Sequence, residues 1–180
     1  MLDLIILIVL FAGIITGLRR GFIVQIMHFV GFFIALIVAY INYKKLADVF
    51  VYWVPYPGFS ENAPSILGLD NIDVDQTFYR ALAFVVIFFI VKIVFQILAS
   101  MFNFIAYLPV LNTMNRFLGM ILGFVEFYIL LFIALYILAL VPLAQIQSLM
   151  SGSIFAGLIV EHTPILTNML QNWWYIYTSN

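Results

Sequence analysis

A long uncharged stretch near the start of the sequence decides what this chain can fold into. Residues 21–43 contain no Asp, Glu, Lys or Arg. As an α-helix they would extend about 34 Å, enough to cross a hydrocarbon core of roughly 30 Å. Only 8% of the 180 residues are charged, whereas 66% are hydrophobic, so the charges are too few to cover a water-exposed surface. The composition therefore predicts an all-α integral membrane protein and not a soluble enzyme.

Apolar runs of this kind recur along the chain and predict about four transmembrane helices. We place these helices at residues 2–18, 21–43, 80–108 and 117–141, with an extramembrane loop at 44–79. Together they form a predicted membrane domain over residues 1–141. The first run is short for a full span, so it either crosses with its arginines snorkelling or forms a tilted or re-entrant helix.

The junction between the first two runs contains only Arg19 and Arg20. A tight hairpin is the favoured arrangement there, and a kinked continuation at Gly17 and Gly21 is the alternative.

The predicted loop differs in composition from the runs around it. It holds three of the six prolines and five of the eight acidic residues, and residues 52–56 form an aromatic patch. Trp and Tyr beside prolines are typical of chain at the lipid headgroups. Asp73 or Asp75 is suitably placed to cap the following helix.

The C-terminal residues 142–180 change pattern again. Apolar residues recur there at helical spacing among Gln and Ser, and Thr163-Pro164 is typical of an N-cap followed by Pro at the first helical position. The tail also carries Trp173, Trp174, Tyr175 and Tyr177. We therefore predict an amphipathic region that lies in the membrane interface and does not span it.

The basic residues bear on orientation. Arg19, Arg20 and Arg116 would lie on one side of the membrane, and Lys44, Lys45 and Arg80 on the other. The count is a tie, but the first helix usually decides. This favours both termini and the acidic loop on the extracytoplasmic side.

Small residues at four-residue spacing mark helix-packing faces. They are Gly13, Gly17, Gly21, Gly119 and Gly123, and Gly31, Ala35 and Ala39 repeat the spacing. Such faces allow helix backbones to approach closely where lipid gives no hydrophobic drive for association. Packing within one chain is favoured over a dimer face or a permeation pathway.

Two ionisable residues inside apolar runs are the principal candidates for a functional site. Lys92 and Glu126 are equally distant in sequence from Pro109, so a turn centred there would level them for an ion pair. Gln96 continues a polar stripe from Lys92. A structural ion pair or hydrogen-bonded network is favoured over a path for an ion or solute.

Other chemistry has little support in the sequence. His28, on one helix face with Gln25, is more readily an interhelical hydrogen bonder than a proton relay. The segment 70–75 alternates oxygen ligands but lacks the turning Gly and the late Glu of a calcium loop. We predict no catalytic residue, metal site or cofactor, and the net charge of −1 argues against nucleic acid as a partner.

Short motifs are spread over nearly the whole chain. They are Gly17-Leu18-Arg19-Arg20-Gly21-Phe22, Trp53-Val54-Pro55-Tyr56-Pro57, Asn115-Arg116-Phe117-Leu118-Gly119 and Thr163-Pro164-Ile165-Leu166. Their order and spacing resemble the colicin V production protein (CvpA) family, especially members from low-GC Gram-positive bacteria. The sequence departs from many relatives at Val125-Glu126-Phe127, where those carry a basic residue and a Gly.

The resemblance implies a multi-pass protein of the bacterial inner membrane with a role in toxin production or secretion and in envelope homeostasis. Because short helices enclose little volume, we expect it to act as a homo-oligomer or with other envelope proteins. The alternatives are a channel or ion-coupled transporter subunit, and a scaffold that recruits an envelope partner through its acidic loop and aromatic tail.

Overall fold

The computed structural model describes residues 1–55, 73–101, 113–141 and 143–175, and these residues contain helices without β-strands. The helices are α1 (Leu2–Trp53), α2 (Val74–Met101), α3 (Thr113–Leu140), α4 (Ala144–Ser151), α5 (Ile154–Glu161) and α6 (Pro164–Trp174). Within the described ranges, α1, α2 and α3 are long and apolar enough to cross a membrane.

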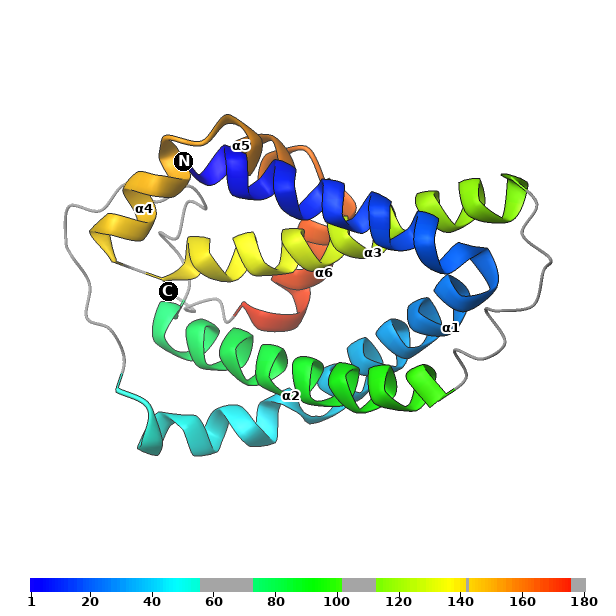
Figure 1. Ribbon diagram of the computed structural model, residues 1–180. Helices are drawn as coiled ribbons and strands as arrows, with labels where there is room; N and C mark the ends of the chain where they lie inside the picture. The colour runs from blue at the N-terminus through cyan, green and yellow to red at the C-terminus, as the bar shows by residue number, and fades with distance from the viewer. Residues whose placement is uncertain (56–72, 102–112, 142, 176–180) are drawn as a thin grey trace.

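Helix α1 is broken at Gly21 into a first arm (residues 2–20) and a second arm (residues 22–53). Gly21 has φ 74° and ψ 170°, in the left-handed region that a residue with a Cβ rarely adopts. Figure 1 shows the second arm folding back from this point. The chain therefore turns back at Gly21, directly after Arg19 and Arg20, whereas Gly17 stays within the helix of the first arm.

The two arms pack with α2 and α3 into an antiparallel arrangement of four segments. The first arm lies beside α3, and the second arm lies beside α2 (Figure 1). Large aromatic side chains fill the space between them. Phe32, Phe88 and Phe132 are fully buried, and the rings of Phe32 and Phe88 meet edge to face with centroids 5.4 Å apart.

The glycine stripes bring backbones together within the chain. A Cβ added at Gly17 would lie 2.1 Å from the carbonyl oxygen of Gly119, and one at Gly123 would lie 2.8 Å from the Cα of Gly17. On the second arm, a Cβ at Gly31 would lie 3.1 Å from the Cβ of Phe95 on α2. These glycine faces are therefore covered by the chain's own helices.

Two of the helices extend into the predicted loop at 44–79. The second arm continues to Trp53, beyond the end of its apolar stretch. Ala47 is buried there while Lys44, Lys45 and Asp48 face outward, so one face of the helix still packs against the protein. At the other end, the carboxylate of Asp73 accepts the N–H of Gln76 at 3.0 Å, which caps α2.

The remaining boundaries also shift. Helix α3 begins at Thr113 and not at 117, and α2 is described only to Met101, so the end of the predicted helix 80–108 lies outside the described residues.

The C-terminal helices pack onto the bundle and do not lie apart from it. Trp174 has no exposed surface and contacts the rings of Phe84 and Tyr136. The hydroxyl of Tyr43 donates to the carbonyl of Trp173 at 2.6 Å. Protein therefore covers the indole of Trp174, because an amphipathic pattern does not reveal whether lipid or protein covers the apolar face. The location of the tail in the membrane interface stays a prediction.

The N-terminus is tied to the tail as well. One oxygen of Asp3 accepts a hydrogen bond from the Ser153 hydroxyl at 2.7 Å and another from the N–H of Phe155 at 2.9 Å. Ser153 is the N-cap of α5, and its hydroxyl also accepts from the N–H of Ala156. Thr163 and Pro164 occupy the N-cap and first position of α6, as the sequence predicts.

We predict that Gly17→Ala lowers the free energy of unfolding by about 1–3 kcal/mol, because the new methyl group must displace the backbone of α3. Denaturant titration in detergent micelles measures the change. Gly157→Ala is the matched control, since no described atom lies within 4 Å of a Cβ built there. Equal unfolding midpoints for the two variants would contradict the close contact.

Candidate functional site

A buried polar network joins three of the four segments. Its centre is Glu126 on α3, whose exposed fraction is only 2%. One carboxylate oxygen accepts the side-chain amide of Gln25, on the second arm, at 2.6 Å. The other oxygen forms an ion pair with the ammonium group of Lys92, on α2. The structure thus brings Lys92 and Glu126 together and adds Gln25 to them.

Local helix geometry explains why these side chains meet. Glu126 follows Gly119 and Gly123 at positions i+7 and i+3, so it lies on the face of α3 that packs toward the interior. Lys92 lies one turn after the buried Phe88, and its ammonium group is 5.3 Å from the ring centre of Phe32. The aromatic ring therefore contributes a cation–π contact to the same charge.

The electrostatics of the network favour a structural role. A charge buried without a partner is costly, whereas Lys92 and Gln25 satisfy both oxygens of Glu126. One group is left over, because the side-chain oxygen of Gln25 has no hydrogen-bond partner among the described residues. An unsatisfied buried acceptor costs about 1–3 kcal/mol, so this atom offsets part of the stabilisation that the network provides.

His28 and Gln96 lie beside the network. His28 is buried one turn after Gln25, and no described residue forms a hydrogen bond with it. With Lys92, Gln96, Gly31 and Phe95 it lines a cavity of about 10 Å³, which is room for one water molecule. Gln96 itself is largely exposed, so only part of the predicted polar stripe faces the interior.

The arginines that bear on orientation gather near the hairpin. Arg19 is exposed and Arg20 half-buried, directly before Gly21. A Cβ at Gly21 would lie 2.5 Å from the side chain of Asn115, which places the exposed Arg116 at the same end of the bundle. The N-terminus lies at the opposite end, beside α4 and α5 (Figure 1).

Gln25 and Phe32 are the partners that the sequence analysis did not assign. Gln25 carries a recognisable signal, since it shares a helix face with His28 and Gly21 inside an uncharged run. Phe32 carries none, because nothing distinguishes it from the other phenylalanines of the second arm.

No metal site emerges from the part of the chain that the structure describes, since no three His, Cys, Asp or Glu side chains gather there. The segment with alternating oxygen ligands at 70–75 lies partly outside the described residues. The chemistry available at the network is therefore that of charge pairing and hydrogen bonding.

Long apolar helices around a buried ion pair define a multi-pass α-helical membrane protein. The family described as Colicin V production protein matches residues 2–164 of the chain. The chain therefore belongs to the colicin V production protein family, as its motifs predict. It is also similar to the uncharacterized transmembrane protein YshB of Bacillus subtilis (strain 168), with 38% identity over 177 residues, 98% of this chain and 99% of that protein. No solved structure matches it.

We predict that Lys92→Ala lowers the free energy of unfolding by about 3–5 kcal/mol, because it leaves Glu126 buried without its counter-ion. Lys45→Ala, at an exposed position of the second arm, is the control and should change stability by less than about 0.5 kcal/mol. Unfolding titrations in micelles measure both. The double variant with Glu126→Ala should lose less than the sum of the single losses, and strict additivity would contradict the pairing.

Proposed function

We propose that this protein is a non-enzymatic, cofactor-free component of the bacterial inner membrane that supports the production or secretion of a colicin V-like peptide toxin and envelope homeostasis. The observation that carries the proposal is membership of the colicin V production protein family over residues 2–164. The name of that family supplies the link to toxin production.

The geometry of the network is consistent with this role. Lys92, Glu126 and Gln25 satisfy one another inside the bundle and hold three segments in register. In our proposal, the two arms of α1 together with α2 and α3 provide four spans. The first arm supports this, because its 19 residues would extend about 28 Å, close to a full crossing.

In this proposal the protein supports toxin export from within the membrane. Its outer surface contacts further copies of the protein or other envelope proteins. Exposed aromatic side chains at the end of the second arm, Tyr52 and Trp53, support a contact at the headgroup level. A scaffold that recruits partners through the C-terminal tail has less support, since Trp174 is buried in the bundle. The net charge of −1 gives no support for nucleic acid as a partner.

Deletion of the gene should reduce export of the peptide toxin and tolerance to envelope stress, and the wild-type protein should restore both. We expect Lys92→Ala and Glu126→Ala to lose activity in proportion to their loss of membrane abundance, and the charge-swapped double variant to recover part of each. Quantitative immunoblots and secretion assays on the same cultures measure this.

Two outcomes would contradict these statements. A deletion strain with normal secretion and normal stress tolerance would overturn the proposed role. Single variants at full abundance but without activity would show that the charges take part in the activity itself.

A channel or ion-coupled transporter subunit is the second candidate. The cavity between His28, Lys92 and Gln96 favours it, because this cavity could hold one water molecule beside the ion pair. A continuous path would need further openings beyond this one-water cavity.

The chain has no cysteine, so single cysteines can report orientation and water access without background. We propose that the end carrying Arg116 is cytoplasmic. Thr113→Cys should then react with a membrane-impermeant thiol reagent only after permeabilisation, and Gln145→Cys should react in intact cells. Both positions are exposed. The reverse pattern would invert the proposed orientation.

Gln96→Cys tests the transporter candidate in the same assay. If an aqueous path reaches the network, this cysteine reacts from at least one side. Protection from both sides would argue against transport.

A further inference from the structure

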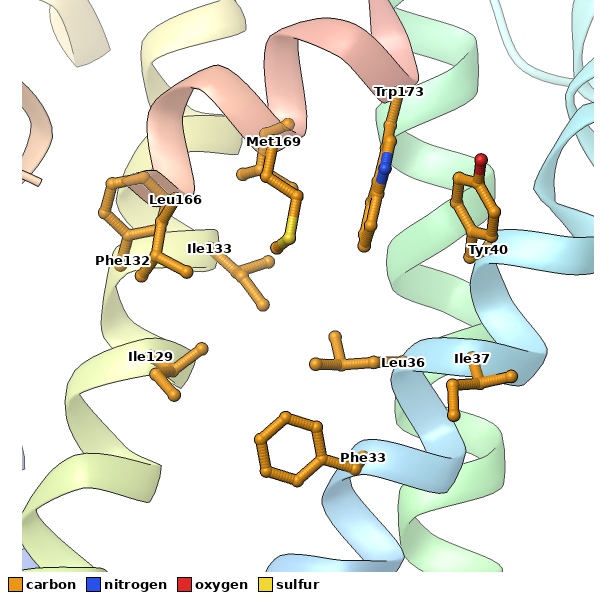
Figure 2. A pocket seen from close by; sticks show the side chains of 11 residues that line it. Phe33, Leu36, Ile37, Tyr40, Ile129, Phe132, Ile133, Leu166, Met169 and Trp173 are labelled. Carbon is orange, nitrogen blue, oxygen red and sulfur yellow. The ribbon is translucent and has the colours of Figure 1, made fainter. Parts of the chain in front are cut away.

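An apolar pocket of about 340 Å³ lies between the second arm, α3 and α6 (Figure 2). Its volume is within the range of pockets that bind small molecules, and its lining is entirely apolar. The second arm contributes Phe33 and Ile37, α3 contributes Ile129 and Ile133, and α6 contributes Met169 and Trp173. In Figure 2, Met169 points from α6 into the space between the other two helices.

The pocket opens toward the bilayer. Its lining residues on the second arm and α3 lie within uncharged apolar stretches, at membrane depth. Phe33 and Ile37 are 44% and 57% exposed, so they belong to both the pocket and the lipid-facing surface. An apolar cavity does not hold water stably, and the apolar molecule available at this depth is a lipid chain.

A second, polar pocket of about 370 Å³ lies one helical turn further along the second arm, where this arm meets the start of α2. Lys44, Asp48 and Arg80 line it, together with Gln76 and the side chains of Tyr52 and Tyr79. Among the described residues, no ion pair engages Lys44 or Arg80. The two cations and one carboxylate leave a net charge of +1 on its wall.

An aromatic wall connects the two pockets. The ring of Trp173 lies 4.5 Å from that of Tyr40 and 5.8 Å from that of Phe84, measured between centroids. Tyr40 precedes Lys44 by one turn, and Phe84 follows Arg80 by one turn, a rise of about 6 Å in each case. The apolar pocket and the cationic pocket thus follow each other along the membrane normal. A phospholipid has the same order, with its acyl chain at membrane depth and its phosphate at the surface.

We propose that the two pockets form one site for a single anionic phospholipid. An acyl chain occupies the apolar pocket against Trp173, and the phosphodiester lies between Lys44 and Arg80. The net charge of +1 complements a phosphodiester with one negative charge. The site lies outside the buried network of Glu126 and selects lipids by headgroup charge.

Trp173 provides the test because it borders the apolar pocket. In a Trp53→Phe background, which removes the exposed indole, the full-length protein is reconstituted in phosphatidylcholine vesicles. Brominated phosphatidylglycerol or brominated phosphatidylcholine is added at equal mole fractions. We expect phosphatidylglycerol to quench the Trp173 fluorescence with about fivefold to thirtyfold higher apparent affinity, as expected for one or two cations. The Trp173→Phe variant in the same background measures how much of the fluorescence and its quenching comes from the buried Trp174.

Variants then assign the preference to the polar pocket. Lys44→Ala with Arg80→Ala should equalise the two lipids, whereas Lys45→Ala, which removes an adjacent cation outside the pocket, should leave the preference intact. Equal quenching by both lipids in the parent protein would overturn the proposal, as would an equal loss in Lys45→Ala. Displacement of brominated phosphatidylglycerol by a tenfold lower fraction of a polyprenyl phosphate would also overturn it, by assigning the site to another lipid.

Discussion

The contact between glycine backbones on the first arm and α3 is the constraint on which the remaining structure depends. Gly17 and Gly119 leave no room for a Cβ, so α3 is drawn against the first arm along its whole glycine face. Since Glu126 continues that face, the same packing carries a carboxylate into the bundle, where lipid cannot solvate it. The second arm and α2 must then supply Gln25 and Lys92, which fixes their register relative to α3.

The sequence predicts those features that depend only on which residue types are present and how far apart they stand. Charged residues inside apolar runs, such as Lys92 and Glu126, require a partner, and their equal sequence distance from Pro109 predicts that they lie at the same level. What the patterns miss depends on tertiary context. Gln25 stands out as a polar residue on a helix face with His28 and Gly21, but that pattern does not identify Glu126 as its hydrogen-bond partner. The apolar face of the tail looks the same whether it meets lipid or, as Trp174 does, the rings of Phe84 and Tyr136.

The buried network in the interior and the apolar pocket on the outer surface have different roles. The network around Glu126 is enclosed and leaves room for one water molecule, so it stabilises the relative positions of the helices. The lipid-facing side between the second arm, α3 and α6 is hollowed instead, and α6 closes that hollow with Met169 and Trp173. Helix α6 thus deepens the apolar pocket, which would be shallower if only the second arm and α3 lined it.

The bond between Asp3 and the start of α5 has a consequence for biosynthesis. Asp3 and Ser153 are 150 positions apart, and a chain is synthesised from its N-terminus. The first arm is therefore synthesised long before the carboxylate of Asp3 can meet the hydroxyl and the N–H that bind it. Because Ser153 and Phe155 follow all three long helices in the sequence, the contact that ties down the N-terminus can form only after those helices have been synthesised.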